Sequence, residues 1–581
     1  MILHALVEHY EDLAALGKIS KPGWGLSKVS YALSLSLDGE LLNVTPTLIE
    51  VEQGKKTVLR PQEMTVPEPV IRSSGISANF LCDNSSYFLG IDNKGKPERA
   101  KECFAACAER HEAILEGIDN PVAKAILLFF STWNPDESET NPALAEYLEE
   151  VKAGVNLVFR IDGKYAHEDE DITEAWQYIY NQKEAEETSP CLVTGQSAIA
   201  VELHPKIKGV SGAQSSGANL VSFNSSSVES YGKEQGNNSP VGEYAAFAYG
   251  AALNTLLADR EHTQLLGDTT LVFWAKGGQE VYQDLFGGMF GGGESDKIDN
   301  SGLKAAIERL ADGKVTRWDD IEVSPDTPFY VLGLSPNAAR ISVRFFLRDN
   351  FGTFARRMWE HQQRLEIVRP AFDSREELSY WALLRETINP NSRDKKASPI
   401  MTGELIHAVL SGGRYPATLL NSVMLRIRAE REITRGRAAI IKAYYLHNPH
   451  QDCPEEVLTV AISDSKNPAY LMGRAFSVLE AIQSSANPSI NATIKDKYFN
   501  SASATPATVF PILINLAQHH LRKLETGAQI YHEKELTAIL GDLGDTFPKR
   551  LTLPAQGSFQ LGYYHQTQKR YEKKKEDDKD A

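Results

Sequence analysis

The residues best suited to chemistry lie in one long polar stretch, residues 208–243, with the sequence KGVSGAQSSGANLVSFNSSSVESYGKEQGNNSPVGE. Its glycines let the backbone approach a ligand closely, and its amide and hydroxyl side chains donate and accept hydrogen bonds without charge. Asn and Gln can pair bidentately with adenine, while Lys meets phosphate or guanine. The stretch is therefore predicted to read a nucleic-acid backbone or base edges. A flexible linker is the alternative, because long loops are either functional or disordered.

A second polar group surrounds a short aromatic segment within residues 72–92, RSSGISANFLCDNSSYFLGID. It contains Asn79, Asp83, Asn84 and Tyr87. Side chains of these types either cap backbone groups or face a ligand. The sequence leaves both interpretations open.

Charge is distributed unevenly along the chain, although the net charge of −16 by itself argues against a polyanionic partner. Residues 134–188 hold 15 acidic and 4 basic residues, whereas residues 340–442 hold 19 basic and 11 acidic residues, 16 of the 19 being arginines. Local charge decides where a polyanion binds, so the second segment is the better candidate for contact with nucleic acid. The acidic segment is either a solvated surface, a deterrent to nonspecific DNA binding or a site for a basic partner.

A basic pattern lies in the long helix predicted for residues 416–446. Arg428, Arg431 and Arg435 recur at three- and four-residue spacing, and Lys442 follows two turns later. Residues at this spacing share one helix face, and such a stripe could track phosphates. A solvated helix face explains the pattern equally well.

Local catalytic signatures are missing from the sequence. There is no GxxxxGK[ST], HExxH or GxSxG motif and no zinc-type cysteine spacing, so we predict neither enzyme activity, cofactor nor metal. The five cysteines are odd in number and scattered, which fits a reducing compartment. Cys103 and Cys107, one helical turn apart, are predicted to pack in a core.

Hydrophobic periodicity predicts an α+β fold. Apolar and polar residues alternate on both sides of Asp38-Gly39, which is a strong hairpin signal. In the predicted strand 341–347, Ile341, Val343 and Phe345 form the face expected to be buried. The turn SPNAAR before it is predicted to place Asn337 and Arg340 near a surface. Further strands are predicted at 155–161, 218–223, 269–274 and 329–334, and helices at 121–132, 172–182 and 244–257.

Three regions follow from these patterns. Residues 1–286 are predicted to form a mixed α/β region with β-hairpins, the acidic segment and the polar loop. The glycine-rich stretch 287–293, GGMFGGG, is read as a linker into a central strand-containing region, 287–369. Residues 370–581 are predicted to form an all-α helical bundle that ends in a mixed-charge, disordered tail, 573–581.

No run of about 18 apolar residues occurs, so no membrane span is expected. The first residues, MILHALVEHYEDLAALGK, place apolar side chains at helical spacing and acids where a signal peptide carries bases. They are predicted to form an amphipathic helix of a cytoplasmic protein.

Eight segments in order resemble the large subunit of the type I-C CRISPR surveillance complex, Cascade, from Met1 to about Arg570. They are MILHALVEHYEDL, NFLCDNSSYFLGID, KGVSGAQSSGANLVSFN, SYGKEQGNNSPVGEYAAFAY, GDTTLVFWA, LSPNAARISVRFF, NATIKDKYFNSASATPATVFP and LGYYHQ.

The resemblance implies a noncatalytic protein that recognises the PAM in double-stranded target DNA and promotes R-loop formation. Base pairing with the guide RNA supplies sequence specificity in such complexes, while protein reads the PAM and steadies the displaced strand. The implied partners are this DNA, the guide RNA, the backbone, guide-RNA-end and small subunits, and a helicase-nuclease that docks on the large subunit. The resemblance also implies a small subunit translated from an internal start, for which Met472 is the candidate, giving a small-subunit-like region at 472–575.

Residue chemistry within these segments gives the candidate PAM contacts Asn79, Asn84, Lys208, Gln214, Ser215, Asn219, Lys233 and Gln235. Arg428, Arg431, Arg435 and Lys442 are the candidate contacts to the displaced strand. Two other function classes stay open: a metal-dependent nuclease whose carboxylates meet only in the fold, and an interaction scaffold that never touches DNA.

Overall fold

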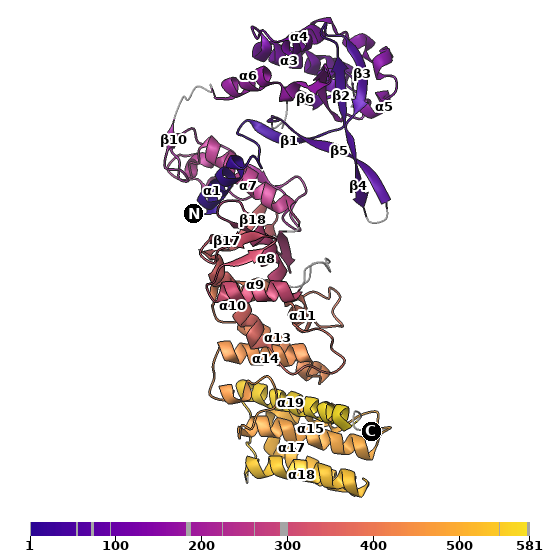
Figure 1. Ribbon diagram of the computed structural model, residues 1–581, viewed down its shortest axis with the longest axis vertical. Helices are drawn as coiled ribbons and strands as arrows, with labels where there is room; N and C mark the ends of the chain where they lie inside the picture. The colour runs from indigo at the N-terminus through magenta and orange to yellow at the C-terminus, as the bar shows by residue number, and fades with distance from the viewer. Residues whose placement is uncertain are drawn as a thin grey trace. The chain divides into compact units, whose positions relative to one another are not determined.

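The computed structural model describes residues 2–53, 56–70, 75–92, 95–181, 188–223, 225–260, 262–290, 300–544 and 546–577. The chain forms two compact units. Unit 1 comprises Leu3–Pro205 and Phe223–Ala252, and unit 2 comprises Lys206–Ser222 and Leu253–Ala581. Strands and helices mix in the first part of the chain, and the described residues after β18 are helical or irregular, which confirms the predicted α+β class (Figure 1). The predicted domain boundary between residues 286 and 287 lies within unit 2, and the chain does not pass from one unit to the other there.

The main sheet of unit 1 is built on β2 (Tyr31–Leu35) and β7 (Asn156–Ile161), which pair in parallel. β3 (Leu41–Pro46) and β6 (Cys82–Asn84) lie at its edges, and β8 (Lys164–Tyr165) pairs with β7. β2 and β3 form the predicted hairpin. Gly39 has a φ of 78°, and a Cβ there would lie 2.6 Å from the Phe129 nitrogen, so the turn requires glycine.

A second sheet in unit 1 is an antiparallel ribbon of β1 (Trp24–Val29), β5 (Lys56–Pro67) and β4 (Leu48–Gln53). Apart from two short strands that belong to the sheet of unit 2, the other elements described in the first 258 residues are α1 (Ile2–Ala15), α2 (Ser85–Phe88), α3 (Pro97–Leu115), α4 (Pro121–Thr132), α5 (Leu148–Lys152), α6 (Glu170–Asn181), α7 (Glu243–Ala258), β9 (Ser189–Pro190), β10 (Ser197–Ala198), and the 3-10 helices η1 (Pro135–Thr140), η2 (Pro142–Leu144), η3 (Ala166–Glu168), η4 (Ser226–Val228) and η5 (Gln235–Asn238).

The core of unit 1 is a cluster of aromatic rings around His111 of α3. Phe88 and Phe159 stack with ring centroids 4.4 Å apart, and Phe130 lies 4.7 Å from the imidazole. His111 Nδ1 donates to the Cys107 carbonyl at 2.7 Å, and its Nε2 accepts from the Leu81 amide at 3.1 Å. Burial lowers the pKa of His111 to about 4, so the ring is neutral and satisfied. Cys103 and Cys107 are buried beside it without a disulfide, as predicted.

Unit 2 is organised on a six-stranded sheet in the order β11-β12-β18-β17-β14-β13. Its strands are β11 (Lys206–Ile207), β12 (Ala218–Asn219), β13 (Thr263–Leu266), β14 (Thr269–Ala275), β17 (Pro328–Asn337) and β18 (Arg340–Asn350). The small strands β15 (Thr316–Trp318) and β16 (Ile321–Val323) form a separate hairpin. Leu271, Phe273, Phe329 and Phe345 contribute to one hydrophobic core with the helices of unit 2.

The helices of unit 2 are α8 (Val281–Met289), α9 (Asn300–Ala311), α10 (Phe351–Leu365), α11 (Tyr380–Arg385), α12 (Pro399–Ser411), α13 (Ala417–Glu430), α14 (Arg435–His447), η6 (Glu455–Val457), α15 (Pro468–Ala486), α16 (Ile494–Ala504), α17 (Pro506–Leu521), α18 (Thr526–Leu543) and α19 (Leu553–Asp577). The last of them gather into a helical bundle (Figure 1). α15 and α19 are in close contact at two glycines. A Cβ on Gly473 would lie 1.9 Å from the Phe559 carbonyl oxygen, and a Cβ on Gly562 would lie 2.1 Å from the Tyr470 carbonyl oxygen.

Several predicted elements need correction. The single helix predicted for 416–446 is two helices, because Arg431 adopts a left-handed conformation with a φ of 57° and ends α13. The predicted linker 287–293 is partly helical, since α8 runs through Gly287 and Gly288, and Phe290 is buried; residues 291–293 lie outside the described residues. α19 extends into the predicted tail as far as Asp577, and residues 578–581 also lie outside the described residues.

The predicted buried face of β18 is right for Ile341 and Phe345 and wrong for Val343, which is 40% exposed. The register shifts because Gly333 faces Phe345 while Leu334 faces Val343, so Arg344 is an extra residue in β18. An extra residue in one strand re-aims the neighbouring side chains. Strict alternation therefore fails at this bulge.

Candidate nucleic-acid interface

Asn79 and Asn84 are engaged within the fold of unit 1. The buried Asn79 accepts the Val70 amide proton at 2.9 Å, and Asn84 caps α2 by accepting from the Ser86 amide at 3.0 Å. Asp83 accepts from the amides of both asparagines, each at 2.8 Å. Tyr87 Oη accepts from the Ser77 amide at 3.3 Å. Of the two interpretations left open by the sequence, the structure thus shows the capping one.

Lys208, Gln214 and Ser215 lie on a loop of unit 2 that is attached to the sheet edge, and Asn219 lies in the strand that follows this loop. β11 and β12 bracket this loop, and β12 pairs with β18 at Asn219 and Arg340. The side chains of Lys208, Gln214 and Ser215 are exposed, whereas Asn219 is half-buried. The predicted strand 218–223 is thus confirmed only in its first two residues, 218 and 219.

The loop is held in place by contacts that the sequence did not single out. Asn254 of α7 accepts from the Lys208 amide at 2.8 Å and donates to the Lys206 carbonyl at 3.2 Å. A Cβ on Gly217, whose φ is 97°, would lie 2.9 Å from the Lys206 Cβ. A Cβ on Gly212 would lie 3.3 Å from Pro336 of β17. The loop therefore packs beside the exposed turn at Asn337.

Lys233 and Gln235 lie on a second loop, which belongs to unit 1, and both side chains are exposed. Asn238 closes this loop: its Oδ1 accepts from the Ser230 amide at 2.8 Å, and its Nδ2 donates to the carbonyls of Lys233 and Gln235 at 2.9 and 3.0 Å. Gly236 lets the loop pack directly against the backbone at Val201, because a Cβ at this position would lie 1.9 Å from the Val201 carbonyl oxygen. The candidate PAM residues are thus divided between the two units.

The predicted exposed basic stripe is wrong for two of its four members. Arg435 and Lys442 are only 8% and 3% exposed. Arg435 pairs with Asp373, and Lys442 Nζ donates to the Arg364 carbonyl at 3.0 Å. Burial lowers the pKa of Lys442 to about 8. Arg428 is exposed and donates to Gln556 at 2.9 Å, and Arg431 is half-buried at the break between the helices.

Many other arginines of the basic segment also pair with carboxylates inside unit 2. Arg437, likewise buried, contacts Glu386 at 3.2 Å and also bonds Glu430. Other pairs are Arg344–Asp268 at 3.0 Å, Arg357–Asp349 at 3.1 Å and Arg364–Glu360 at 2.9 Å. Many arginines of the segment are therefore engaged by carboxylates within the fold, and all of these carboxylates except Asp268 belong to the same segment.

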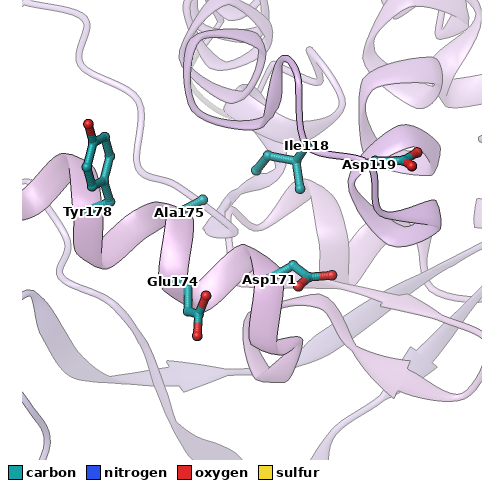
Figure 2. Close-up of a pocket in the computed structure, with 6 residues that line it drawn as sticks. All are labelled: Ile118, Asp119, Asp171, Glu174, Ala175 and Tyr178. Carbon is teal, nitrogen blue, oxygen red and sulfur yellow. The ribbon is translucent and has the colours of Figure 1, made fainter.

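The acidic segment of unit 1 contributes a pocket of the opposite character. Figure 2 shows Asp171, Glu174 and Tyr178 along α6, with Asp119 on the facing segment. Asp171 accepts from Asn120 Nδ2 at 2.7 Å, and Asp119 pairs with Lys124. These carboxylates repel phosphate, so this pocket is a poor place for nucleic acid.

Within the part of the chain that the structure describes, no group of three or more His, Cys, Asp or Glu side chains is arranged to hold a metal ion. A search of the same residues finds no helix both long and apolar enough to cross a bilayer.

Comparison with known proteins identifies the family of the chain. The chain has no significant match among curated proteins. Residues 6–571 match the family model described as CRISPR-associated protein (Cas_Csd1), which spans nearly the whole chain and both units. The chain therefore belongs to the Cas_Csd1 family of CRISPR-associated proteins and is a subunit of the Cascade type.

Proposed function

We propose that this protein is the noncatalytic large subunit of a type I-C Cascade. In that role it recognises the PAM in double-stranded DNA, promotes pairing of the guide RNA with the target strand, holds the displaced strand and offers a docking surface to the helicase-nuclease. The family match supports the Cascade setting. In RNA-guided complexes base pairing reads the target, so the protein needs contacts only to a short duplex and to the displaced strand.

The observation that carries PAM recognition is the loop of residues 208–222 on the sheet edge of unit 2. It exposes Lys208, Gln214 and Ser215, and its Gly212 packs against Pro336, the residue before the exposed Asn337. An amide can pair with adenine in the major groove, a lysine can meet guanine or phosphate, and a hydroxyl suits either partner. Asn254 and Gly217 hold the backbone of the loop, so these side chains are presented from a fixed base.

Lys233 and Gln235 on the loop closed by Asn238 provide a second exposed group of the same chemistry. Arg428 and Arg431 stay in the proposal as contacts to the displaced strand, whereas Arg435 and Lys442 act within the fold. Asn79 and Asn84 already hold backbone groups, so the proposal relies on the exposed members of the set.

The test uses assembled complexes that carry Gln214→Ala or Lys233→Ala and target duplexes with or without the PAM. A lost contact to a base edge costs about 1–3 kcal/mol, so each variant should bind the PAM duplex about 5- to 160-fold more weakly and discriminate less. Gln363→Ala removes an exposed glutamine on α10 and serves as the control. Unchanged affinity and discrimination in both loop variants would show that the loops are structural.

A further inference from the structure

Phe372 is an aromatic side chain that the fold of unit 2 leaves almost fully in water, with 90% of its surface exposed. It lies near the apex of a tight turn at residues 370–373, closed by a hydrogen bond of 3.0 Å from the Asp373 amide to the Pro370 carbonyl. The ring gains nothing from packing there. A lone exposed ring is ordinary on a protein surface, so a role for Phe372 has to be argued from its support and from its charged neighbours.

The turn is rigidly attached to the core. Asp373 accepts two hydrogen bonds from Arg375, from Nε at 2.9 Å and from Nη2 at 3.0 Å. The buried Arg435 donates to Asp373 at 3.3 Å, to the Arg375 carbonyl at 2.6 Å and to the Glu376 carbonyl at 2.7 Å. Phe372 is thus held out on a fixed support, which reduces the entropy lost on binding.

Positive charge flanks the ring on both sides in sequence. Arg369 is exposed and donates to the Ser374 carbonyl at 3.4 Å, and the side chain of Arg375 is 55% exposed. Of the nearby acids, Asp373 is buried and Glu377 pairs with Lys304 at 3.3 Å, while Glu376 is exposed.

Exposed aromatic and basic side chains also occur together farther along the chain. Trp381 on α11 is 43% exposed, and Arg385, one turn later on that helix, is also exposed. The loop after α11 exposes Arg393, Lys395 and Lys396, together with Asp394. Exposed aromatic rings with neighbouring basic residues are the composition of a surface that binds single strands.

We propose that Phe372, Arg369 and Arg375 form a stacking platform for single-stranded nucleic acid, and that Trp381 and Arg385 offer a second contact of the same kind farther along the chain. An unpaired base stacks on the phenyl ring, and the Arg369 guanidinium meets an adjoining phosphate. Arg375, whose Nε and Nη2 bind Asp373, contributes its remaining N–H groups. An apolar pocket of a protein partner fits less well, because it would have to desolvate both flanking arginines. The platform deepens the proposed function, in which the displaced strand would be its ligand.

The direct test is fluorescence anisotropy of a labelled 20-nucleotide oligo(dT) with the full chain. Phe372→Ala should weaken binding roughly 5- to 160-fold, and Phe372→Trp should restore it, because stacking needs only an aromatic face. Arg369→Gln should reduce the slope of log affinity against log salt by about 0.7. Tyr178→Ala, which removes an exposed aromatic ring beside the acidic pocket, is the matched control and should change nothing.

A second measurement separates the platform from the proposed function. In the assembled complex on target duplex, permanganate should oxidise displaced-strand thymines more in Phe372→Ala than in wild type, with duplex binding unchanged. If Phe372→Ala equals wild type in the oligonucleotide and permanganate assays while the complex still discriminates the PAM, the platform is overturned and the proposed function stands. If wild type ignores the PAM, the proposed function fails and the oligonucleotide assay alone decides on the platform. Impaired assembly with unchanged oligonucleotide affinity would assign Phe372 to a protein contact and overturn the inference.

Discussion

Arg435 Nη1 lies 3.3 Å from Asp373 Oδ2, and both side chains are buried in unit 2. Removing Arg435 takes away a charged donor of hydrogen bonds to Asp373 and to the Arg375 and Glu376 carbonyls, which costs about 1.5–3 kcal/mol, while Asp373 keeps its two hydrogen bonds from Arg375. Arg435→Ala should therefore lower the free energy of unfolding of unit 2 by this amount, as measured by urea denaturation. Arg393→Ala removes an exposed arginine of the same segment, on the loop after α11, and should change it by less than about 0.5 kcal/mol. Equal effects of the two substitutions would contradict the division into buried and exposed arginines.

Gly473 on α15 should tolerate no side chain. A Cβ at this position would lie 1.9 Å from the Phe559 carbonyl oxygen of α19, so Gly473→Ala must push the two helices apart. We expect a loss of about 3 kcal/mol or more in unfolding free energy, measured by thermal or chemical denaturation. Gly541→Ala on α18 meets nothing within 4 Å and should be neutral or slightly stabilising. A small effect of Gly473→Ala would show that the bundle packs less closely.

His262 should stabilise unit 2 in a pH-dependent manner. Its Nδ1 contacts Asp259 at 2.5 Å and its Nε2 contacts Asp284 at 2.7 Å. Burial alone lowers the pKa of His262, but the hydrogen bonds to Asp284 and Asp259 outweigh it and raise the pKa to about 9. The folded pKa exceeds the unfolded value, so the stabilisation is complete below about pH 6.5 and is lost as pH rises through 9.

The pH dependence is measured by comparing the urea midpoints of wild type and His262→Gln. At about pH 6 the variant should be less stable by about 3 kcal/mol. This free energy corresponds to the rise in the pKa of His262 from 6.5 in the unfolded chain to about 9 in the folded one. At about pH 10 the difference should largely disappear. A difference independent of pH would mean that the imidazole acts by packing and not by its charge.

Translation from Met472 should give a poorly folded small subunit, because Met472 lies inside α15. Such a product lacks Asn467, which caps the helix by accepting from the Tyr470 amide at 3.1 Å. It also lacks the buried Tyr470, whose hydroxyl lies 2.9 Å from His565 Nδ1. Thermal unfolding of fragments 462–581 and 472–581 should show a higher and more cooperative transition for the longer one. Equal transitions would make Met472 an adequate start.

Local patterns predicted the elements well and the environment of polar side chains poorly. The helix 121–132 and the hairpin at Asp38-Gly39 follow from local periodicity and turn chemistry, and the structure confirms both. The burial of Arg435 depends on Asp373, 62 residues away in the chain, which no helical spacing could indicate. Asn254, a polar residue within an apolar helix pattern, was the signal for a loop anchor. Its partners are the Lys208 amide and the Lys206 carbonyl, which are backbone groups that the sequence does not mark.

The chain passes between the two compact units after residues 205, 222 and 252, so neither unit is one continuous stretch. A fragment ending at 252 carries β11 and β12 without β18, and a fragment beginning at 253 leaves the outer edge of β18 bare. Unpaired strand edges recruit other chains and promote aggregation. Splitting this protein for separate production should therefore succeed only by co-expression of the pieces, since each one supplies backbone partners that the other lacks.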